Sequence, residues 1–206
     1  GIEVNGNLSG LITYMRTDSN RLSGEFVAKA KEHIASEYGD KYVGAYKFAK
    51  AKENTQDAHE GIRPTNINNT PKKIQKFLSA EQFKIYELIW NRTIASMMSD
   101  AILETSTYKI SNQENVEFKS VNTKVLFEGY KKVYNDGEVE VNNKVNLNVG
   151  DTIEVLEYEK TQHFTQPKPR YSEARLIKEL EENGVGRPST YANIIDTLKT
   201  RSYVNV

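Results

Sequence analysis

The sequence contains no cysteine, which removes several kinds of chemistry at once. Without thiols the chain cannot form disulfide bonds, use a cysteine nucleophile or bind zinc through thiolates. It also has no apolar run near the roughly 20 residues that a membrane-spanning helix needs, and its mean hydropathy is -0.66. We therefore expect no membrane partner, and the lack of cysteine fits a reducing compartment such as the cytoplasm.

Sequence motifs for nucleotides and metals are missing as well. There is no P-loop pattern and no G-x-G-x-x-G fingerprint. His33, His59 and His163 lie far apart and lack the spacing of zinc ligands. The pair His59–Glu60 is not followed by a second histidine four residues later, which excludes a zincin motif. We expect no metal site in this chain, and we interpret His33, in the middle of an expected helix, as a surface residue.

The formal net charge is zero, although the charges are unevenly distributed. Lys and Arg outnumber Asp and Glu in residues 1–98 and 161–206, and the reverse holds in residues 99–160. This arrangement leaves two candidate surfaces for phosphate. Because the opening stretch "GIEVNGN" lacks an initiator methionine, we expect the chain to be an internal segment of a longer protein.

Residues 1–98 predict a mixed unit with two main helices. Ser23 can cap a helix over about 24–38 that Gly39 ends. Pro71 can begin a short helix, and Ser79 with Gln82 has the spacing of a capping box at the start of a longer one. The buried positions expected on the two long helices are Phe26, Val27, Ala30, Ile34, Phe83, Tyr86, Ile89, Trp90, Ile94, Met97, Met98 and Ala101. We interpret Trp90 as a packing anchor rather than a binding platform, and we expect extended segments at "LITYM" and "VGAYKFA".

From about residue 104 to residue 160 the apolar residues recur with a period of two. This pattern predicts antiparallel strands with one face in water, and "NDG" (135–137) predicts a turn. The alternating apolar pairs are Tyr108/Ile110, Val116/Phe118, Val125/Phe127, Val139/Val141, Val145/Leu147 and Ile153/Val155. The region carries no cluster of catalytic side chains, so we interpret it as a scaffold.

The last segment, residues 161–206, predicts two short helices in a helix-turn-helix layout. Ser172 can cap the first helix, Gly184 can end it, and Pro188 can begin the second. The stretch "SYVNV" could begin a wing strand. Because many proteins with this layout never contact DNA, the layout alone leaves nucleic-acid binding open.

The stretch "ITYMRTDS" (12–19) contains the most suggestive chemistry. In an extended segment, Tyr14 and Arg16 point to the same face. A phenol with a pKa of about 10 is protonated at neutral pH, but a neighbouring guanidinium favours the phenolate and can also hold a phosphate. A tyrosine that attacks a phosphodiester forms an ester with a good leaving group, so the cut strand can be rejoined. The spacing equally allows Tyr14 to pack in a core while Arg16 lies in solvent.

Four motifs in order decide between these interpretations. "GLITYMRTDS" (10–19) resembles the active-site tyrosine motif of type IA DNA topoisomerases, bacterial topoisomerase I in particular. "DAHEGIRPT" (57–65) and "YELIWNRTIASMM" (86–98) are similar to two further segments of that family. "FTQPKPRYSEARLIKELEENGVGRPSTYANII" (164–195) resembles its late proline-rich and Gly-Arg-Pro-Ser-Thr-Tyr-Ala segments. The resemblance runs nearly from end to end and is weakest across residues 104–160.

The resemblance implies an α+β multidomain fold and a role for each matching residue. Residues 1–98 would form a winged-helix-like α/β domain that carries the tyrosine, residues 99–160 an antiparallel β gate or arch domain, and residues 161–206 the start of a second winged-helix-like domain. Tyr14 would be the nucleophile that forms a 5′-phosphotyrosyl link on single-stranded DNA and relaxes negative supercoils. Arg16 and His59 would act on the scissile phosphate or its neighbour. The residues assigned to DNA binding are Thr13, Asp18, Arg187, Ser189 and Thr190.

The resemblance also implies parts that lie outside this chain. In the family, an N-terminal toprim domain supplies a Glu and clustered Asp residues that bind Mg²⁺, and this chain has no D-x-D-x-E cluster. We therefore expect the toprim domain to be a partner within the same polypeptide, the segment to be inactive alone, and the enzyme to be cytoplasmic and associated with the nucleoid. Two departures stand out: Gly61 replaces a usual Ala and should loosen the local backbone, and Ser202 replaces a usual Gly.

Two rival functions stay open at this point. The chain could be a DNA-binding or partner-binding module that keeps the fold without the chemistry. It could also be a tyrosine recombinase or relaxase, although those enzymes need several basic residues or a histidine cluster near the tyrosine.

Overall fold

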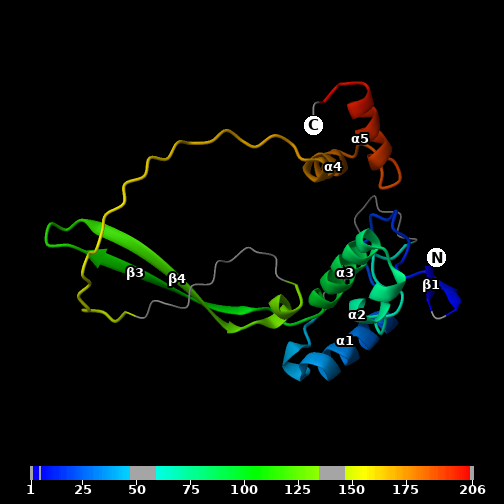
Figure 1. Ribbon diagram of the computed structural model, residues 1–206, viewed down its shortest axis with the longest axis horizontal. Helices are drawn as coiled ribbons and strands as arrows, with labels where there is room; N and C mark the ends of the chain where they lie inside the picture. The colour runs from blue at the N-terminus through cyan, green and yellow to red at the C-terminus, as the bar shows by residue number, and fades with distance from the viewer. Residues whose placement is uncertain (1, 5, 47–58, 135–146, 205–206) are drawn as a thin grey trace. The chain divides into compact units, whose positions relative to one another are not determined.

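The computed structural model describes residues 2–4, 6–46, 59–134 and 147–204 (Figure 1). The chain divides into two compact units, Gly1–Leu147 and Asn148–Val206. The first unit holds a helical core and a two-stranded ribbon, and the second holds a pair of helices. The predicted boundaries at residues 98/99 and 160/161 stay a prediction.

Two helices, α1 (Gly24–Tyr38) and α3 (Ala80–Ala95), form the centre of the first unit. Their predicted caps are confirmed. The Ser23 hydroxyl accepts a hydrogen bond from the Phe26 N–H, and Ser79 with Gln82 forms the capping box. The remaining elements of this part are β1 (Ile2–Val4), β2 (Asn7–Ser9), η1 (Asp40–Tyr42), α2 (Pro71–Ile74) and η2 (Gln75–Phe77), with β1 and β2 paired antiparallel.

The hydrophobic core of the first unit lies between α1, α3 and the segments that pack on them. Its buried members are Leu11, Leu22, Phe26, Val27, Ala30, Ile34, Tyr42, Ile67, Ile74, Tyr86, Trp90, Ile94, Met97 and Met98. The Trp90 side chain is 5% exposed, and its Nε1 donates to the Ile67 carbonyl at 3.2 Å. Trp90 is therefore a packing anchor, as predicted. Phe83, Ile89 and Ala101 are less deeply placed than expected, since they are only partly buried.

His33 is not the surface residue that we expected. Its ring lies edge-on to Trp90 with 5.7 Å between centroids, and burial lowers the pKa of His33. The charge of Glu37 opposes this shift, while that of Lys73 adds to it. A mid-helix histidine at the border of the apolar face cannot be assigned from helical period alone, because its neighbour comes from a different helix.

Ser99 joins the end of α3 to the ribbon that follows. Its N–H donates to the Tyr42 carbonyl at 2.9 Å, its carbonyl accepts from the Tyr130 N–H at 2.9 Å, and its hydroxyl donates to the Lys41 carbonyl at 2.8 Å. A Cβ on Gly129 would lie 2.4 Å from the Asp100 carbonyl oxygen, so the backbones meet here too closely for a side chain. The expected strand at "VGAYKFA" is reduced to a single bridge between Val43 and Met98 in residues 43–46, and its remainder lies outside the described residues.

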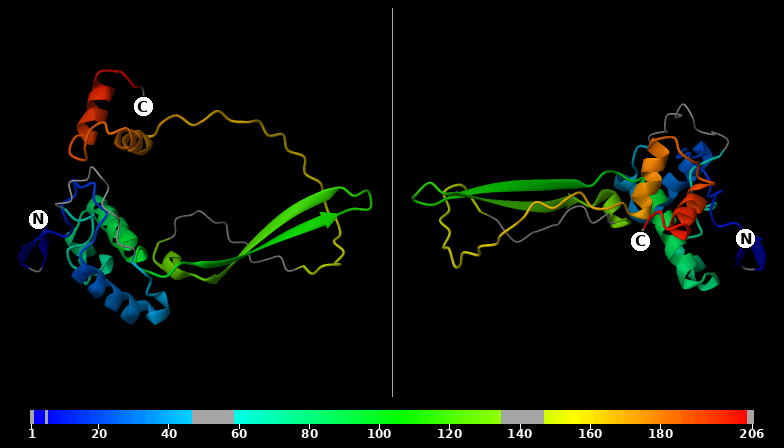
Figure 2. Two further views of the ribbon diagram at one scale, coloured as in Figure 1. Left: turned by 180° about the vertical axis from the view of Figure 1, so that it is seen from behind. Right: turned by 90° about the horizontal axis from the view of Figure 1, so that it is seen from above.

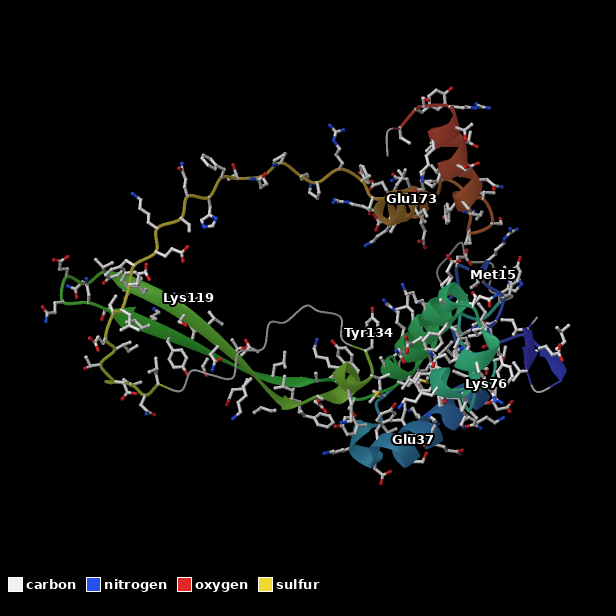
Figure 3. All side chains as sticks on the ribbon, in the orientation of Figure 1. Met15, Glu37, Lys76, Lys119, Tyr134 and Glu173 are labelled. Atoms are coloured by element: carbon white, nitrogen blue, oxygen red, sulfur yellow. The ribbon has the colours of Figure 1, made fainter. Side chains whose placement is uncertain are left out.

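The ribbon consists of β3 (Ile102–Ser111) and β4 (Glu117–Phe127), which pair antiparallel. Figure 2 shows the two strands twisting around each other along their length. Phe118 and Val121 lie on opposite faces, yet they are 46% and 53% exposed, and side chains project from both faces around Lys119 (Figure 3). Burial nevertheless alternates along β3, where Tyr108 and Ile110 are partly buried and Thr107 and Lys109 are exposed. The predicted alternation is confirmed there, but neither face of the ribbon is fully covered.

The other strands predicted for residues 99–160 did not appear where the structure can test them. The pairs Val139/Val141 and Val145/Leu147 lie wholly or partly outside the described residues. Residues 148–171 hold neither helix nor strand, so the strand expected at Ile153 and Val155 is absent. Alternation alone cannot tell a strand from an extended segment that lacks a pairing partner.

The second unit contains α4 (Glu173–Glu182) and α5 (Tyr191–Thr200). The Ser172 hydroxyl caps α4 as predicted, and an ion pair between Glu173 and Lys199 joins the two helices. The second helix begins at Tyr191, three residues after the predicted Pro188, which lies in a turn. Residues 201–204 form a turn and a bend, so the expected wing strand is absent from the described residues.

Both helices of the second unit end in the same backbone arrangement. After α4, the Val185 N–H donates to the Leu180 carbonyl at 2.8 Å and Gly184 has φ of 69°. After α5, the Tyr203 N–H donates to the Leu198 carbonyl at 2.9 Å, and Ser202 has φ of 56°. These are Schellman motifs, whose left-handed position favours glycine. Ser202, where the resemblance implies a usual Gly, therefore adopts a conformation that costs serine more than glycine.

We predict that His33 makes the first unit less stable in acid. Because the folded pKa of His33 lies below its unfolded value of about 6.5, the unfolded state binds more protons at acidic pH, so stability is full above that value and falls as the pH drops toward the folded pKa. His33→Gln should lose less stability than wild type between about pH 7.5 and about pH 5.5. Urea unfolding followed by the fluorescence of Trp90, the single tryptophan, measures the difference. His163→Gln, in the second unit, is the matched control and should keep the wild-type slope; an equal slope in His33→Gln would contradict the prediction.

Candidate active site

The site begins with the pairing of two segments that lie about fifty residues apart in the sequence. The Thr13 N–H donates to the Arg63 carbonyl at 2.9 Å, and the Thr65 N–H donates to the Leu11 carbonyl at 3.0 Å. Ile12 and Pro64 form an antiparallel bridge between these bonds. The Thr65 hydroxyl adds a bond to the Gly10 carbonyl at 2.7 Å. The motif "GLITYMRTDS" is thereby fixed against the motif "HEGIRPT".

This pairing brings Tyr14 and His59 together. Their ring centroids lie 4.8 Å apart, with an angle of 33° between the ring planes. The Tyr14 side chain is 51% exposed, so its hydroxyl is not sealed in a core. An exposed phenol beside an imidazole can both meet a phosphate from solvent and exchange its proton locally.

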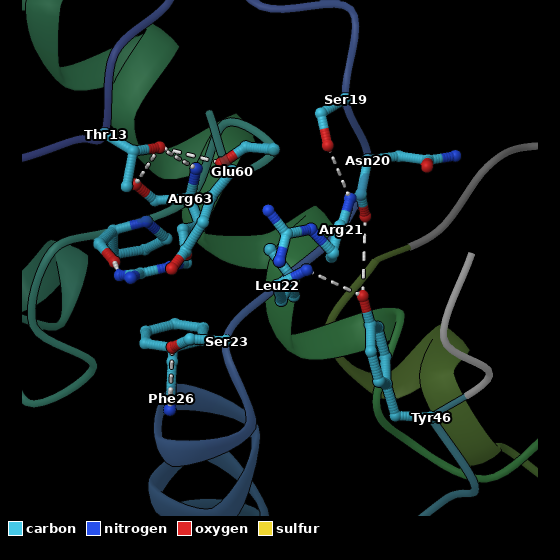
Figure 4. A network of polar contacts seen from close by, with 12 residues as sticks. Thr13, Ser19, Asn20, Arg21, Leu22, Ser23, Phe26, Tyr46, Glu60 and Arg63 are labelled. Carbon is cyan, nitrogen blue, oxygen red and sulfur yellow. Dashed lines mark hydrogen bonds and ion pairs between the residues drawn. The ribbon is translucent and has the colours of Figure 1, made fainter. Parts of the chain in front are cut away.

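Thr13 has a structural part in this pairing. Its hydroxyl donates to the Gly61 carbonyl at 2.8 Å and accepts from the Arg63 N–H at 3.0 Å (Figure 4). The Thr13 hydroxyl thus bonds to two residues, Gly61 and Arg63, of the segment "HEGIRPT". The assignment of Thr13 to DNA binding stays a prediction, and these contacts give the side chain a second use.

The segment after Tyr14 does not continue as a strand. The chain bends at Met15 and Arg16, so the alternation that placed Arg16 beside the Tyr14 hydroxyl does not apply. Arg16 is exposed, and no ion pair joins it to another described residue. The Thr17 hydroxyl accepts from the Ser19 N–H at 3.0 Å and shapes this bend. Asp18 is half-buried within it.

Glu60 and Arg63 form an ion pair that the sequence alone did not suggest to us. Arg63 Nε lies 2.6 Å from Glu60 Oε2, and both side chains are largely buried. The guanidinium also covers the Phe26 ring at 4.2 Å from its centroid. The hydrogen bond from Arg63 holds the pKa of Glu60 below its usual value. An acidic and a basic residue three positions apart in "EGIR" were the available signal, but nothing local shows that they turn inward.

Gly61 lies at a close approach of two backbones. Its N–H donates to the Arg21 carbonyl at 2.8 Å, and a Cβ added to it would lie 3.1 Å from the Cα of Asn20. Alanine at this position would require the neighbouring segment to move by a few tenths of an ångström. The glycine therefore permits close packing here; whether it also loosens the backbone stays a prediction.

A groove of about 1130 Å³ adjoins the tyrosine motif. Thr17, Ser19 and Asn20 line it on the motif's side, and Arg92 and Tyr134 line it on the side of α3 and the ribbon's base. Arg92 donates to the Tyr134 hydroxyl at 3.2 Å. The groove therefore borders the part of the motif that follows Tyr14, and both polar and apolar side chains line it.

In the second unit, Arg187, Ser189 and Thr190 lie in the turn that leads into α5. The Thr190 hydroxyl accepts from the Arg187 N–H at 2.9 Å and lies 3.1 Å from the Arg187 carbonyl oxygen. The Arg187 side chain is exposed and donates to the Gly186 carbonyl at 3.3 Å. The nearby carboxylate of Glu182 pairs instead with Lys178, with 3.8 Å between Glu182 Oε1 and Lys178 Nζ. Arg187 is thus the accessible cation of this turn, while the Thr190 hydroxyl is engaged with the backbone.

The comparisons with known proteins identify the family of the chain. A family model described as DNA topoisomerase matches residues 7–206. The full-length topoisomerase I of Thermotoga maritima has a structure similar to this chain, with a TM-score of 0.74 and 35% sequence identity over 100% of the chain. The chain belongs to the bacterial type IA DNA topoisomerase family. It spans 33% of the length of the Thermotoga maritima chain.

Membership of the topoisomerase family confirms the resemblance that the four motifs indicated. Within the described residues no three His, Asp or Glu side chains lie close enough to hold a metal ion. The expectation that Mg²⁺ is bound outside this chain stays a prediction. None of the helices that the structure describes is long and apolar enough to cross a membrane.

We predict that Arg187 contacts a DNA phosphate. An exposed cation in the turn before a helix supplies charge to the backbone of DNA without reading bases. Arg187→Ala should weaken binding of a labelled single-stranded oligonucleotide and lower the slope of log K against log salt by roughly 0.7. Fluorescence anisotropy at several salt concentrations measures both quantities.

Arg201→Ala is the matched control, because Arg201 follows the opposite end of α5. It removes the same charge away from the turn and should leave the slope nearer to that of wild type. If Arg187→Ala and Arg201→Ala behave alike, the turn has no special part in holding DNA.

Proposed function

We propose that this chain is the central segment of a type IA DNA topoisomerase, and that Tyr14 is the nucleophile that cleaves single-stranded DNA. The observation that carries the proposal is the half-exposed Tyr14 ring against His59 at 4.8 Å, in a chain of this family. The two residues lie far apart in the sequence, so the fold brings a phenol and an imidazole together, and this supports the proposal.

In the cleavage step, the Tyr14 hydroxyl oxygen attacks the phosphorus of a phosphodiester. The bond between phosphorus and the 3′ oxygen of the preceding nucleotide breaks. The phenol loses its proton, and the leaving 3′ oxygen gains a proton to become a 3′-hydroxyl. The 5′-phosphate stays on Tyr14 as an ester. Attack by the 3′-hydroxyl reverses each of these changes and needs no external energy, because one phosphoester replaces another. Passage of a strand through the break relaxes negative supercoils.

His59 and Arg16 have distinct parts in this proposal. His59, beside the phenol, contacts the scissile phosphate or its neighbour. Arg16 lies in the exposed bend after Tyr14 and can turn toward a phosphate that arrives there, where its guanidinium stabilises the added negative charge of the transition state. Asp18, and Arg187, Ser189 and Thr190 of the second unit, are proposed to contact DNA.

The toprim domain and its Mg²⁺ are proposed to lie elsewhere in the same polypeptide, in a cytoplasmic enzyme associated with the nucleoid. A bound divalent cation would supply further charge neutralisation at the phosphate. No residue of this chain is proposed as its ligand.

The first experiment tests Tyr14 in the complete polypeptide. Tyr14→Phe keeps the ring against His59 and removes only the attacking oxygen, so it should abolish covalent protein–DNA adducts while leaving DNA binding largely intact. Denaturing gels with an end-labelled oligonucleotide detect the adduct. Tyr171→Phe, at an exposed tyrosine of the second unit, is the control and should form adducts normally. An adduct in Tyr14→Phe would sink the assignment, because another residue would then be the nucleophile, whereas the absence of an adduct in the wild type would favour a DNA-binding module without this chemistry.

The second experiment tests whether the segment is inactive by itself. Attack on a phosphodiester anion needs charge neutralisation, and the described residues lack a carboxylate cluster to hold a metal. The purified 206-residue chain with Mg²⁺ should relax negatively supercoiled plasmid no faster than its Tyr14→Phe variant. Relaxation above that background would show that the segment is sufficient, and would contradict this prediction without touching the role of Tyr14.

A further inference from the structure

We propose that the Glu60–Arg63 ion pair is a positioning device that holds the His59 ring against Tyr14. The inference rests on the proposed function of Tyr14, but it concerns two residues that the sequence did not single out. They are positioning residues, because neither is proposed to touch the DNA.

The first step is the anchoring of Arg63 from several directions. Its Nε donates to Glu60 at 2.6 Å and its Nη1 donates to the Pro64 carbonyl at 2.9 Å. Its guanidinium plane covers the buried Phe26 ring of α1. The side chain is only 13% exposed. A planar guanidinium with these contacts has little freedom to rotate, so it fixes the segment to the hydrophobic core.

The second step is the seat of the Glu60 carboxylate at the start of α1. The hydrogen bond from Arg63 lowers the pKa of Glu60 most, and a backbone hydrogen bond from Ser23 and the charge of Arg21 act in the same sense. Ser23 is the N-cap of α1, where the helix dipole also favours a negative charge. Glu60 is therefore ionised at neutral pH, and its ion pair with Arg63, whose guanidinium covers Phe26 of α1, connects the segment "HEGIRPT" to the beginning of that helix.

The third step is the place of these anchors relative to the two rings. Glu60 directly follows His59 along the chain, and Thr13 directly precedes Tyr14. Thr13 is bonded through both its N–H and its hydroxyl to the backbone of Arg63. Glu60 is thus the anchor next to His59, and Thr13 is the anchor next to Tyr14. Both anchors bond to Arg63 (Figure 4). Release of Glu60 would loosen His59 and Glu60 themselves, while Gly61 stays bonded to Arg21 and Thr13, and Tyr14 stays held by Thr13.

An exposed ion pair would not carry this argument, since such pairs contribute little to stability. The chain offers a direct comparison on α1, where Glu25 and Lys29 lie 2.7 Å apart with side chains 80% and 63% exposed. Glu25→Gln is therefore the matched control for Glu60→Gln, with the same change of charge on a carboxylate bonded to a cation.

The test has two readouts. In the isotopically labelled 206-residue chain, Glu60→Gln should weaken the nuclear Overhauser contacts between the Tyr14 and His59 rings at least about twofold, while Glu25→Gln should leave them unchanged. In the complete polypeptide, single-turnover adduct formation should slow between about tenfold and a hundredfold with an unchanged KM for the oligonucleotide, because misplacement acts on the chemical step. Trp90 fluorescence during urea unfolding checks that both variants fold.

Several outcomes would overturn the inference. A folded Glu60→Gln variant with unchanged ring contacts and an unchanged adduct rate would show that the pair does not position His59. If Glu60→Gln fails to fold, Arg63→Lys replaces it, since it keeps the charge but loses the planar contacts with Phe26 and Pro64. If neither variant folds, the pair is a stability element and the positioning role is withdrawn. Failure of the proposed function is separate, because it would appear as an adduct formed by Tyr14→Phe.

Discussion

The bond between the Thr13 hydroxyl and the backbone of the returning segment is the interaction on which the candidate site depends. The Thr13 hydroxyl donates to the Gly61 carbonyl and accepts from the Arg63 N–H. It closes a pairing that is otherwise too short to count as a sheet, because the flanking segments form only one bridge, at Ile12 and Pro64. Side-chain bonds that satisfy a loop's backbone groups let a site lie at the surface without a regular sheet to support it.

Two aromatic side chains of α3 bond to the backbone just after the segment "HEGIRPT" and fix it to the core. Tyr86 donates its hydroxyl to the Asn69 carbonyl at 2.6 Å, and Trp90 donates its Nε1 to the Ile67 carbonyl at 3.2 Å. Burial raises the pKa of Tyr86 to about 12, so this phenol stays protonated and keeps donating across the physiological range. It contrasts with Tyr14, which is half-exposed and free to meet a phosphate. Burial thus gives Tyr86 a structural role, and exposure is what the proposed role of Tyr14 requires.

The sequence predicted those features that are fixed by neighbours along the chain. The caps at Ser23, Ser79 and Ser172, and the buried face of α1, follow from local spacing, and the structure confirms them. The ordered motifs also identified the family, because a motif keeps its residues even where its partner lies far away. The motifs at 10–19 and 57–65 therefore identified Tyr14 and His59 as candidate site residues before the structure showed their contact.

What the sequence did not predict depends on contacts between distant segments. The inward turn of Glu60 and Arg63 requires Phe26 and the start of α1, and the burial of His33 requires Trp90 of another helix. The strand expected at Ile153 failed for the same reason, since a strand exists only if another one pairs with it. The bend at Arg16 arises from hydroxyl-to-backbone bonds at Thr17 and Ser19, and these compete with extended structure in a way that alternation does not reveal.

The ribbon and the site share a single rigid element. A two-stranded ribbon is marginal by itself. β3–β4 is held at its base, where the Phe127 ring lies 4.8 Å from that of Tyr42 and Ser99 bonds to two backbone segments, at Lys41–Tyr42 and at Tyr130. Ser99 closely follows α3, the helix whose Trp90 and Tyr86 support the site segment. A 16-residue helix is roughly 24 Å long and resists bending. The base of the ribbon is therefore fixed to the same helix as the site. A change in the direction of the ribbon would have to arise from residues after Ser99. There the backbones of Gly129 and Asp100 approach so closely that position 129 has no room for a side chain.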